Sequence, residues 1–277
     1  MPTAKLGEVD IKYYTIGSGK PILFISGLGM DHRTWMPQML FFKEKFKVIV
    51  FDNRGMGEST GSLGPYTIPI MAEDAVNLLE HLGIDKAHIV GSSMGGMIAQ
   101  EMAINYPEKV DKLILCSTTA KLSKETRQQI LRGLHNIVDG KVDNILSINP
   151  HRILFERAFN YIMQLTFSKE FLEMNKQFIE NMLRNYSTKL SYTETLLKQI
   201  RGVIKHDTSR KLGKIKAETL VMTGTCDKLI PSKDSEILYN GISNSTLVKI
   251  VCGTHGMHHE KANEFNEEIL RFLDGVK

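Results

Sequence analysis

The chain has 277 residues, of which 42% are hydrophobic and 24% are charged, so it is long enough to bury a full core in one large domain. Its net charge is only +4, from 35 basic and 31 acidic residues, and no dense run of Lys or Arg forms a basic stripe. This balance argues against nucleic-acid binding and against a polybasic membrane contact. No apolar stretch approaches membrane-spanning length, and residues 1–7 lack the apolar core of a signal peptide, so we expect a cytoplasmic protein.

Strands and helices alternate over the first 120 residues. Apolar runs predict strands over 8–15, 21–26, 47–52, 87–90 and 113–117. Helical spacing of apolar residues predicts a helix over 70–82, which Gly83 ends, and a second helical segment over 97–102. This alternation is typical of an α/β protein with a mostly parallel sheet that helices cover on both faces.

The strand signal gives way to helical periodicity between about Ala120 and Asp207. The predicted helices span 126–138, 152–167, 170–186 and 193–204, with breaks at Gly140 and Pro150. Met and aromatic side chains are frequent here: Phe155, Phe159, Tyr161, Met163, Phe167, Met174, Phe178 and Met182. We expect about three in four of them to pack between helices, and the rest to line an apolar pocket.

A Gly-x-Ser-x-Gly sequence, Gly91-Ser92-Ser93-Met94-Gly95, lies between the strand over 87–90 and the helical segment over 97–102. A strand, a tight turn and a helix in this order would project the Ser93 hydroxyl out of the sheet as a nucleophile. So sharp a turn leaves no room for side chains at Gly91 and Gly95. The Met94 amide, at the start of the helix, would be the nearest donor to an oxyanion.

The residues that a serine nucleophile needs follow further along the chain. An apolar strand that begins near Thr219 leads into a loop that carries Asp227, and a second strand over 246–251 leads into a loop with His255, His258 and His259. Ser93, Asp227 and one of these histidines would therefore lie at the carboxyl ends of parallel strands, which form one edge of the sheet.

The chain resembles the α/β-hydrolase superfamily, in its cofactor-free branch of carboxylesterases, enol-lactonases and haloperoxidase-like enzymes. The matching segments are Ser26-Gly27-Leu28-Gly29-Met30-Asp31 with Trp35, Asp52 to Ser59, the serine turn, the loop from Gly224 to Pro231, and His255-x-x-His258-x-Glu260. The resemblance implies an α/β-hydrolase core over residues 1–120 and 207–277 and an inserted helical cap over 121–206.

The resemblance also assigns roles to residues. It makes His255 the catalytic base with His258 as the reserve choice, Asp227 the acid of the triad, and the amides of Leu28 and Met94 the oxyanion hole. It implies that Asp52, Arg54 and Ser59 brace a turn. Ser26-Gly27 stands where many relatives have His-Gly. Because the oxyanion donor is a backbone amide, we expect this difference to change the shape of the loop and the fit of the substrate more than the catalytic mechanism.

These residues predict a serine hydrolase that cleaves a small carboxylic ester or lactone through an acyl-enzyme on Ser93. Peroxyacid formation or hydrolysis of a carbon–carbon bond on the same triad is an alternative, and a small-ligand receptor with vestigial hydrolysis is a non-catalytic one. Arg132, Arg152 and Arg157 would bind the carboxylate of an acidic substrate, although solvated arginines are the better default.

We expect neither a cofactor nor a metal, because the cluster of His255, His258, His259 and Glu260 lacks a metal-binding His-Glu-x-x-His pattern. The expected partner is a small-molecule substrate, with no nucleic acid and no membrane, and a homodimer is left open. Cys116, Cys226 and Cys252 are predicted to be reduced thiols, with Cys226 buried.

Overall fold

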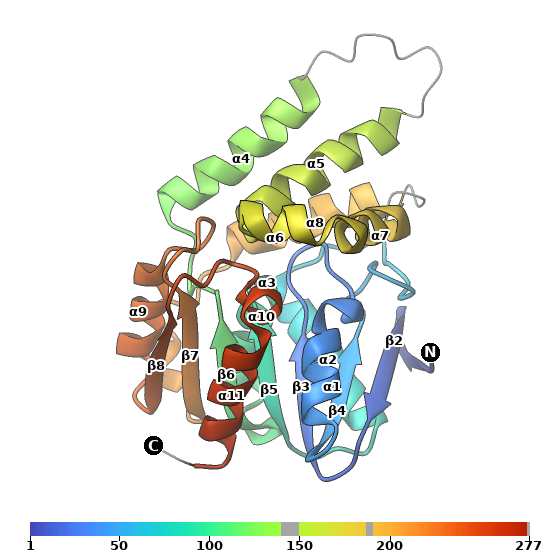
Figure 1. The fold of residues 1–277 in the computed structure, drawn as a ribbon. Coiled ribbons are helices and arrows are strands. Elements are labelled where there is room, and N and C mark those ends of the chain that lie inside the picture. The colour runs from blue at the N-terminus through green and yellow to red at the C-terminus, as the bar shows by residue number, and fades with distance from the viewer. Residues whose placement is uncertain (140–149, 187–190, 276–277) are drawn as a thin grey trace.

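The computed structural model describes residues 1–139, 150–186 and 191–275, and its centre is an eight-stranded sheet with the order β1-β2-β4-β3-β5-β6-β7-β8 (Figure 1). The strands are β1 (Thr3–Leu6), β2 (Val9–Ile16), β3 (Lys20–Ile25), β4 (Phe46–Phe51), β5 (Ala87–Ser92), β6 (Val110–Cys116), β7 (Glu218–Gly224) and β8 (Ser245–Ile250). Pairing is antiparallel for β1 with β2 and for β2 with β4, and parallel for the other neighbours. The predicted α/β fold with a mostly parallel sheet is confirmed.

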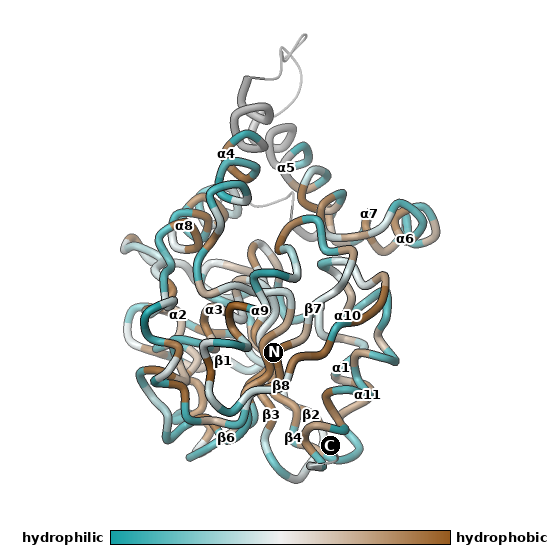
Figure 2. Tube along the Cα trace, turned by 90° about the vertical axis from the view of Figure 1, so that its left-hand side faces the viewer, coloured by the Kyte–Doolittle hydropathy of each residue, from teal (hydrophilic) through white to brown (hydrophobic). Residues whose placement is uncertain are grey.

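The buried strands carry apolar side chains on both faces. In β3, Leu23 and Ile25 belong to one core cluster, whereas Ile22 and Phe24 belong to the other, as the two-residue period of a strand requires. Helices α2 (Ile68–His81), α3 (Met94–Asn105) and α9 (Ser232–Gly241) contribute to the first cluster, and α1 (Met36–Phe42), α10 (Met257–Glu260) and α11 (Ala262–Leu273) to the second. Figure 2 shows the hydrophobic strands at the centre and more hydrophilic segments outside.

Parallel pairing brings the loops that carry the predicted site residues to one edge of the sheet. Ile25 pairs with Gly91, Ser92 with Cys116, and Gly224 with Ile250, so β3, β5, β6, β7 and β8 all end at about the same level. The segments that follow β3, β5, β7 and β8 contain the predicted oxyanion and triad residues. The sheet thus gathers residues that lie more than 200 positions apart in the sequence.

In the described parts of the segment between β6 and β7, five α-helices stand over this edge of the sheet (Figure 1). These cap helices are α4 (Lys124–Asp139), α5 (Pro150–Thr166), α6 (Lys169–Met174), α7 (Lys176–Tyr186) and α8 (Ser191–Lys205). The single helix predicted over 170–186 is wrong, because Asn175 leaves helical geometry and separates α6 from α7. The break predicted at Gly140 lies outside the described residues, and the division into core and cap domains stays a prediction.

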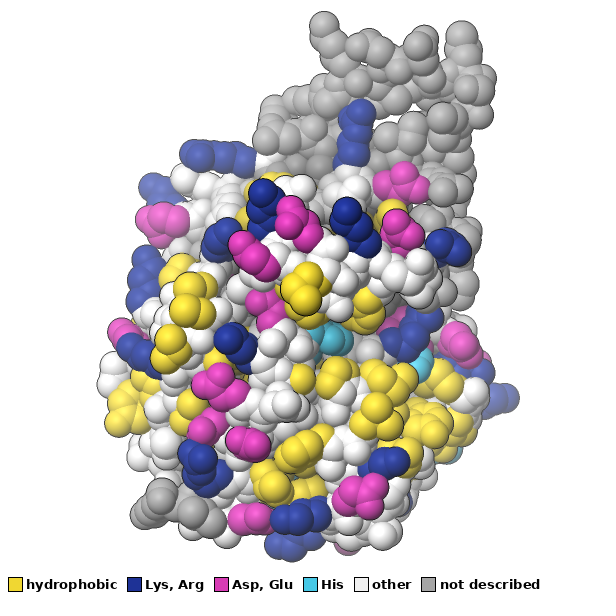
Figure 3. All heavy atoms as spheres, viewed as in Figure 1, with side chains coloured by type: hydrophobic (Ala, Val, Ile, Leu, Met, Phe, Trp, Pro, Cys, Tyr) yellow, Lys and Arg dark blue, Asp and Glu magenta, His cyan; other side chains and the backbone are white. Residues whose placement is uncertain are grey.

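Short 3-10 helices connect several of these elements: η1 (His32–Trp35), η2 (Pro107–Lys109) and η4 (Leu212–Lys214). Across the part of the chain that the structure describes, none of the helices has both the length and the apolar character needed to cross a bilayer. On the face shown in Figure 3, basic and acidic side chains are interspersed.

Candidate active site

Ser93 occupies the turn between β5 and α3 in a strained backbone conformation. Its φ is 56° and its ψ is −120°, a region that residues other than glycine rarely adopt and that costs about 1–3 kcal/mol. Two hydrogen bonds hold the turn: the Ser93 amide donates to the carbonyl oxygen of Cys116 (2.9 Å), and the Thr118 hydroxyl donates to the carbonyl oxygen of Ser93 (2.7 Å). The local sequence therefore forms the strand–turn–helix that was predicted, with the serine at its apex.

The glycines on both sides of Ser93 are required by close backbone packing. A Cβ atom on Gly91 would collide with the backbone of Gly95, and a Cβ on Gly95 would collide with the carbonyl of Ile25 at the end of β3. Any side chain at either position would push the turn away from the sheet.

Asp227 and His255 meet across the ends of β7 and β8. The Nδ1 atom of His255 lies 2.9 Å from Oδ2 of Asp227, and both side chains are largely buried. The other carboxylate oxygen, Oδ1, accepts hydrogen bonds from the amides of Leu229 and Ile230, each at 2.9 Å. With Oδ1 occupied by backbone donors, the carboxylate presents Oδ2 to the imidazole and fixes its orientation.

His258, the reserve choice for the base, has different partners. Its Nε2 atom lies 3.2 Å from the hydroxyl of Thr34, and the same hydroxyl lies 3.3 Å from Nε2 of His259. Burial, reinforced by the neighbouring His259 and His255, lowers the pKa of His258 well below its ordinary value, and burial lowers the pKa of His259 to about 4. The structure therefore pairs the carboxylate of Asp227 with His255, while His258 is a neutral, buried side chain at neutral pH.

The two predicted oxyanion donors lie beside Ser93. Leu28 and Met94 line the same cavity as Ser93 and His255, and a Cβ on Gly27 would sit 3.3 Å from the Cβ of Ser93. Among the hydrogen bonds of the described residues, none uses the amide of Leu28 or of Met94. Both amides are thus free to donate to a ligand atom near Ser93.

A buried glutamine on α8 supports the loop that carries Leu28. The amide of Gly29 donates to Oε1 of Gln199 (3.0 Å), and Gln199 is completely buried. The loop and α8 are 170 residues apart, and no local motif signals this contact, so sequence analysis missed it.

The cap helices also contact the loop that carries His255. The amide of Gly256 donates to the carbonyl oxygen of Thr166 (2.7 Å), and the amide of Ser168 donates to Oε1 of Glu260 (2.6 Å). The junction between α5 and α6 therefore rests directly on the residues that follow His255. These contacts were not predicted, because three of their four groups belong to the backbone and carry no sequence signal.

The Met and aromatic side chains of the cap helices include both predicted kinds, those that pack between helices and those that line the pocket, with Met174 as an exception. Tyr161, Phe167 and Met182 line the cavity over Ser93. Phe159 and Met163 pack in a cluster with Met56 and Tyr192, and Phe178 packs against Phe171 and His259. Met174 fits neither expectation, because it is 85% exposed, and the side chain of Phe155 lies outside the described residues.

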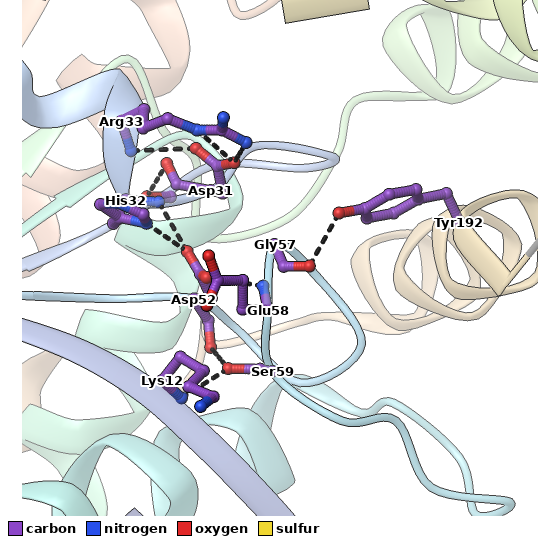
Figure 4. Close-up of polar contacts among 10 residues, drawn as sticks. Lys12, Asp31, His32, Arg33, Asp52, Gly57, Glu58, Ser59 and Tyr192 are labelled. Carbon is purple, nitrogen blue, oxygen red and sulfur yellow. Dashed lines mark hydrogen bonds and ion pairs between the residues drawn. The ribbon is translucent and has the colours of Figure 1, made fainter. Parts of the chain in front are cut away.

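Two of the residues expected to brace a turn, Asp52 and Ser59, lie in a dense polar network (Figure 4). Asp52 accepts hydrogen bonds from the amide of His32 (2.9 Å) and from that of Glu58 (2.9 Å), and the Ser59 hydroxyl donates to its carbonyl oxygen (2.7 Å). Nearby, Arg54 forms two 2.6 Å contacts with the buried carboxylate of Asp74. This arrangement supports the bracing interpretation.

Asp31, His32 and Asp52 place possible metal ligands within 4.8 Å of one another. Burial disfavours the charged form of His32, but its hydrogen bond to Asp52 and the attraction of that carboxylate outweigh burial and raise its pKa. The carboxylate of Asp31 is bound by the guanidinium and the amide of Arg33. Because protein donors already occupy both carboxylates, the residues fit an ion-pair network rather than a metal site.

Cys226 corrects the expectation that its thiol is buried. Cys226 is exposed because it lies in the turn directly after β7, and Cys252 is exposed in the turn after β8. Only Cys116, in β6, is buried among the three, and burial raises the pKa of its thiol.

Comparison with known proteins gives a consistent set of similarities. A family model described as "alpha/beta hydrolase fold" matches residues 20–262. The chain is 26% identical, over 100% of its own length and 99% of the relative, to the "Putative carbamate hydrolase RutD" of Azorhizobium caulinodans. It is 26% identical, over 95% of its length and 92% of the relative, to "3-oxoadipate enol-lactonase 2" of Acinetobacter baylyi. The crystal structure of the enol-lactonase from Burkholderia xenovorans LB400 superposes with a TM-score of 0.86 at 20% identity, over 99% of this chain and 100% of that one.

Proposed function

The chain belongs to the alpha/beta hydrolase fold family, and we propose that it is a serine hydrolase that cleaves a small carboxylic ester or lactone through an acyl-enzyme on Ser93. The observation that carries this proposal is the cavity shared by Ser93, in its strained turn, and His255, which is held by Asp227. A nucleophile, a base and an orienting carboxylate that follow the sheet in this order form the constellation used for acyl transfer.

The mechanism follows from the position of each group. His255, whose Nδ1–H donates to Asp227, takes the Ser93 proton on Nε2 as the serine oxygen attacks the substrate carbonyl. The amides of Leu28 and Met94 donate to the oxyanion of the tetrahedral intermediate. The imidazolium then protonates the departing alcohol, which leaves the acyl group on Ser93, and a water activated by His255 releases the acid.

The relatives support this class of reaction. The carbamate and the enol lactone in their names both contain a carbonyl carbon bonded to a heteroatom that leaves as the bond is cleaved. The Ser-Asp-His geometry suits attack on such a carbonyl, and none of the proposed steps requires a metal or an organic cofactor.

Trapping the acyl-enzyme tests the proposal. Rapid quenching of the enzyme with p-nitrophenyl acetate, followed by digestion and mass spectrometry, should give one acetyl group on the peptide that contains Ser93. The same experiment with Asp227→Asn should give much slower acetylation, because the imidazole loses its orienting carboxylate. Acetylation on another residue, or turnover with no acylated Ser93 peptide in either protein, would contradict the mechanism.

A further inference from the structure

The wall of the cavity over Ser93 is made almost entirely of apolar side chains. Met94, Met97, Leu122, Leu229 and Ile230 form its lower part, on the core side. The cap helices close it from above with Ile130, Ile162, Leu165, Met182, Leu196 and Ile200. A substrate that reaches Ser93 must therefore place the group beside its carbonyl among hydrocarbon side chains.

No Lys, Arg, Asp or Glu lies in this wall among the described residues. Two histidines lie in this wall: His255 is paired with Asp227, and His258 is a neutral side chain because burial lowers its pKa. Of the arginines considered for a substrate carboxylate, Arg132 is exposed, Arg157 does not line the cavity, and the side chain of Arg152 lies outside the described residues.

Three polar side chains of the wall, apart from the triad, have partners in the protein, whereas the buried indole Nε1 of Trp35 has no hydrogen-bond partner among the described residues. The hydroxyl of Thr34 is shared by His258 and His259, Tyr161 donates to the carbonyl oxygen of Gln129 (3.4 Å), and Thr166 donates to that of Ile162 (2.8 Å). A carboxylate in this space would lose its hydration without gaining a cation, and the single neutral N–H of Trp35 would replace only part of that hydration, so burying the carboxylate is strongly unfavourable.

We propose that this cavity selects an ester or lactone whose acyl group is uncharged and apolar, and that it rejects substrates with a second, anionic carboxylate. The inference rests on the proposed function and narrows its substrate class. The proposed substrate differs from the one in the name 3-oxoadipate enol-lactonase, because an enol lactone of a dicarboxylic acid keeps one free carboxylate.

Matched esters test the selectivity. p-Nitrophenyl hexanoate and mono-p-nitrophenyl adipate have acyl chains of the same length and differ by the terminal carboxylate, and the methyl ester of the adipate controls for its size. We expect kcat/KM for the hexanoate to exceed that for the adipate by about 100-fold or more, with most of the loss recovered in the methyl ester. Equal values for hexanoate and adipate would overturn the inference and leave the serine hydrolase mechanism intact.

A variant with a new cation tests the same idea from the opposite direction. Met182→Arg would place a guanidinium in the wall, whereas Met174→Arg adds the same charge at an exposed site on α6. We expect Met182→Arg to shift the adipate-to-hexanoate ratio by about 10-fold toward adipate, and Met174→Arg to leave it unchanged. Equal shifts in the two variants would mean that the cavity does not sense the charge, and thermal melts establish that each variant is folded.

A binding measurement keeps the inference testable even if no ester is hydrolysed. Trp35, the single tryptophan of the chain, lines the cavity, so its fluorescence reports occupancy. In Ser93→Ala, 2-heptanone should change the Trp35 emission at concentrations at least about 10-fold lower than 6-oxoheptanoate, which has the same chain with a terminal carboxylate. Equal affinity for the two ligands would refute the selectivity, and a failure of hydrolysis with this selectivity preserved would refute only the proposed function.

Discussion

Replacement of Gln199 by leucine tests whether α8 holds the oxyanion loop in place. The side chain of Gln199 is completely buried, and its Oε1 atom accepts a hydrogen bond from the Gly29 amide. Leucine has a similar size but lacks this acceptor. A buried amide without an acceptor costs about 1–3 kcal/mol, so the loop relaxes and moves the neighbouring Leu28 amide.

The size of the expected effect follows from the role of that amide. Loss of one oxyanion donor costs about 100-fold to 1000-fold in kcat, and a loop that shifts without losing the donor should cost less. We expect Gln199→Leu to lower kcat about 10-fold, equivalent to about 1.4 kcal/mol in the transition state, with KM changed by less than about 3-fold.

Steady-state hydrolysis of p-nitrophenyl esters measures both constants. Gln100→Leu is the matched control, because Gln100 is also completely buried and its hydrogen bonds go to Thr119 and Thr208 rather than to the oxyanion loop. A folded Gln199→Leu enzyme with kcat within twofold of wild type would refute the reasoning. An equal decrease in both variants would assign the effect to general destabilisation.

Three further predictions concern the cap contact, the serine turn and stability at low pH. Glu260→Ala removes the 2.6 Å hydrogen bond from the Ser168 amide, which joins the cap helices to the segment after His255. KM for esters should therefore rise several-fold, and an unchanged KM would contradict this prediction. Gly95→Ala would force a Cβ against the carbonyl of Ile25, so the thermal midpoint should fall by several degrees and ester hydrolysis by at least about 10-fold, as melts and assays would show. Burial lowers the pKa of His206 to about 4, below the ordinary value of 6.5, so between these pH values the unfolded chain binds a proton that the folded chain does not. The free energy of unfolding, measured by urea denaturation, should therefore be constant above pH 6.5 and decrease toward pH 4. The decrease should be smaller in His206→Gln.

Local sequence patterns predicted those parts of the site that depend on backbone geometry. The turn at Ser93 follows from the small residues around it, because Gly91 and Gly95 are required by contacts within or next to the turn itself. Asp227 and a group of three histidines were located by their positions after apolar strands, and the resemblance to the α/β-hydrolases selected His255 among the three. Parallel pairing explains why those positions lie at one edge of the sheet.

Features that depend on distant contacts were beyond such patterns. The position of β4 between β2 and β3 is set by packing across the sheet, and β1, with four residues and a lysine near its middle, has no clear alternation. The contact of Gln199 with Gly29 joins segments that are far apart in sequence. The exposure of Cys226 depends on a turn whose direction is fixed by its hydrogen bond to Gly253 on the neighbouring loop.

The most direct test of the account is the reaction of wild-type protein and Ser93→Ala with a fluorophosphonate probe, measured beside hydrolysis of p-nitrophenyl esters. Ser209→Ala, at an exposed position, is the control for the substitution itself. The account predicts that wild type and Ser209→Ala are labelled and active, and that Ser93→Ala loses labelling and several orders of magnitude in rate. Labelling and hydrolysis that persist in a folded Ser93→Ala protein would contradict the assignment of Ser93 as the nucleophile.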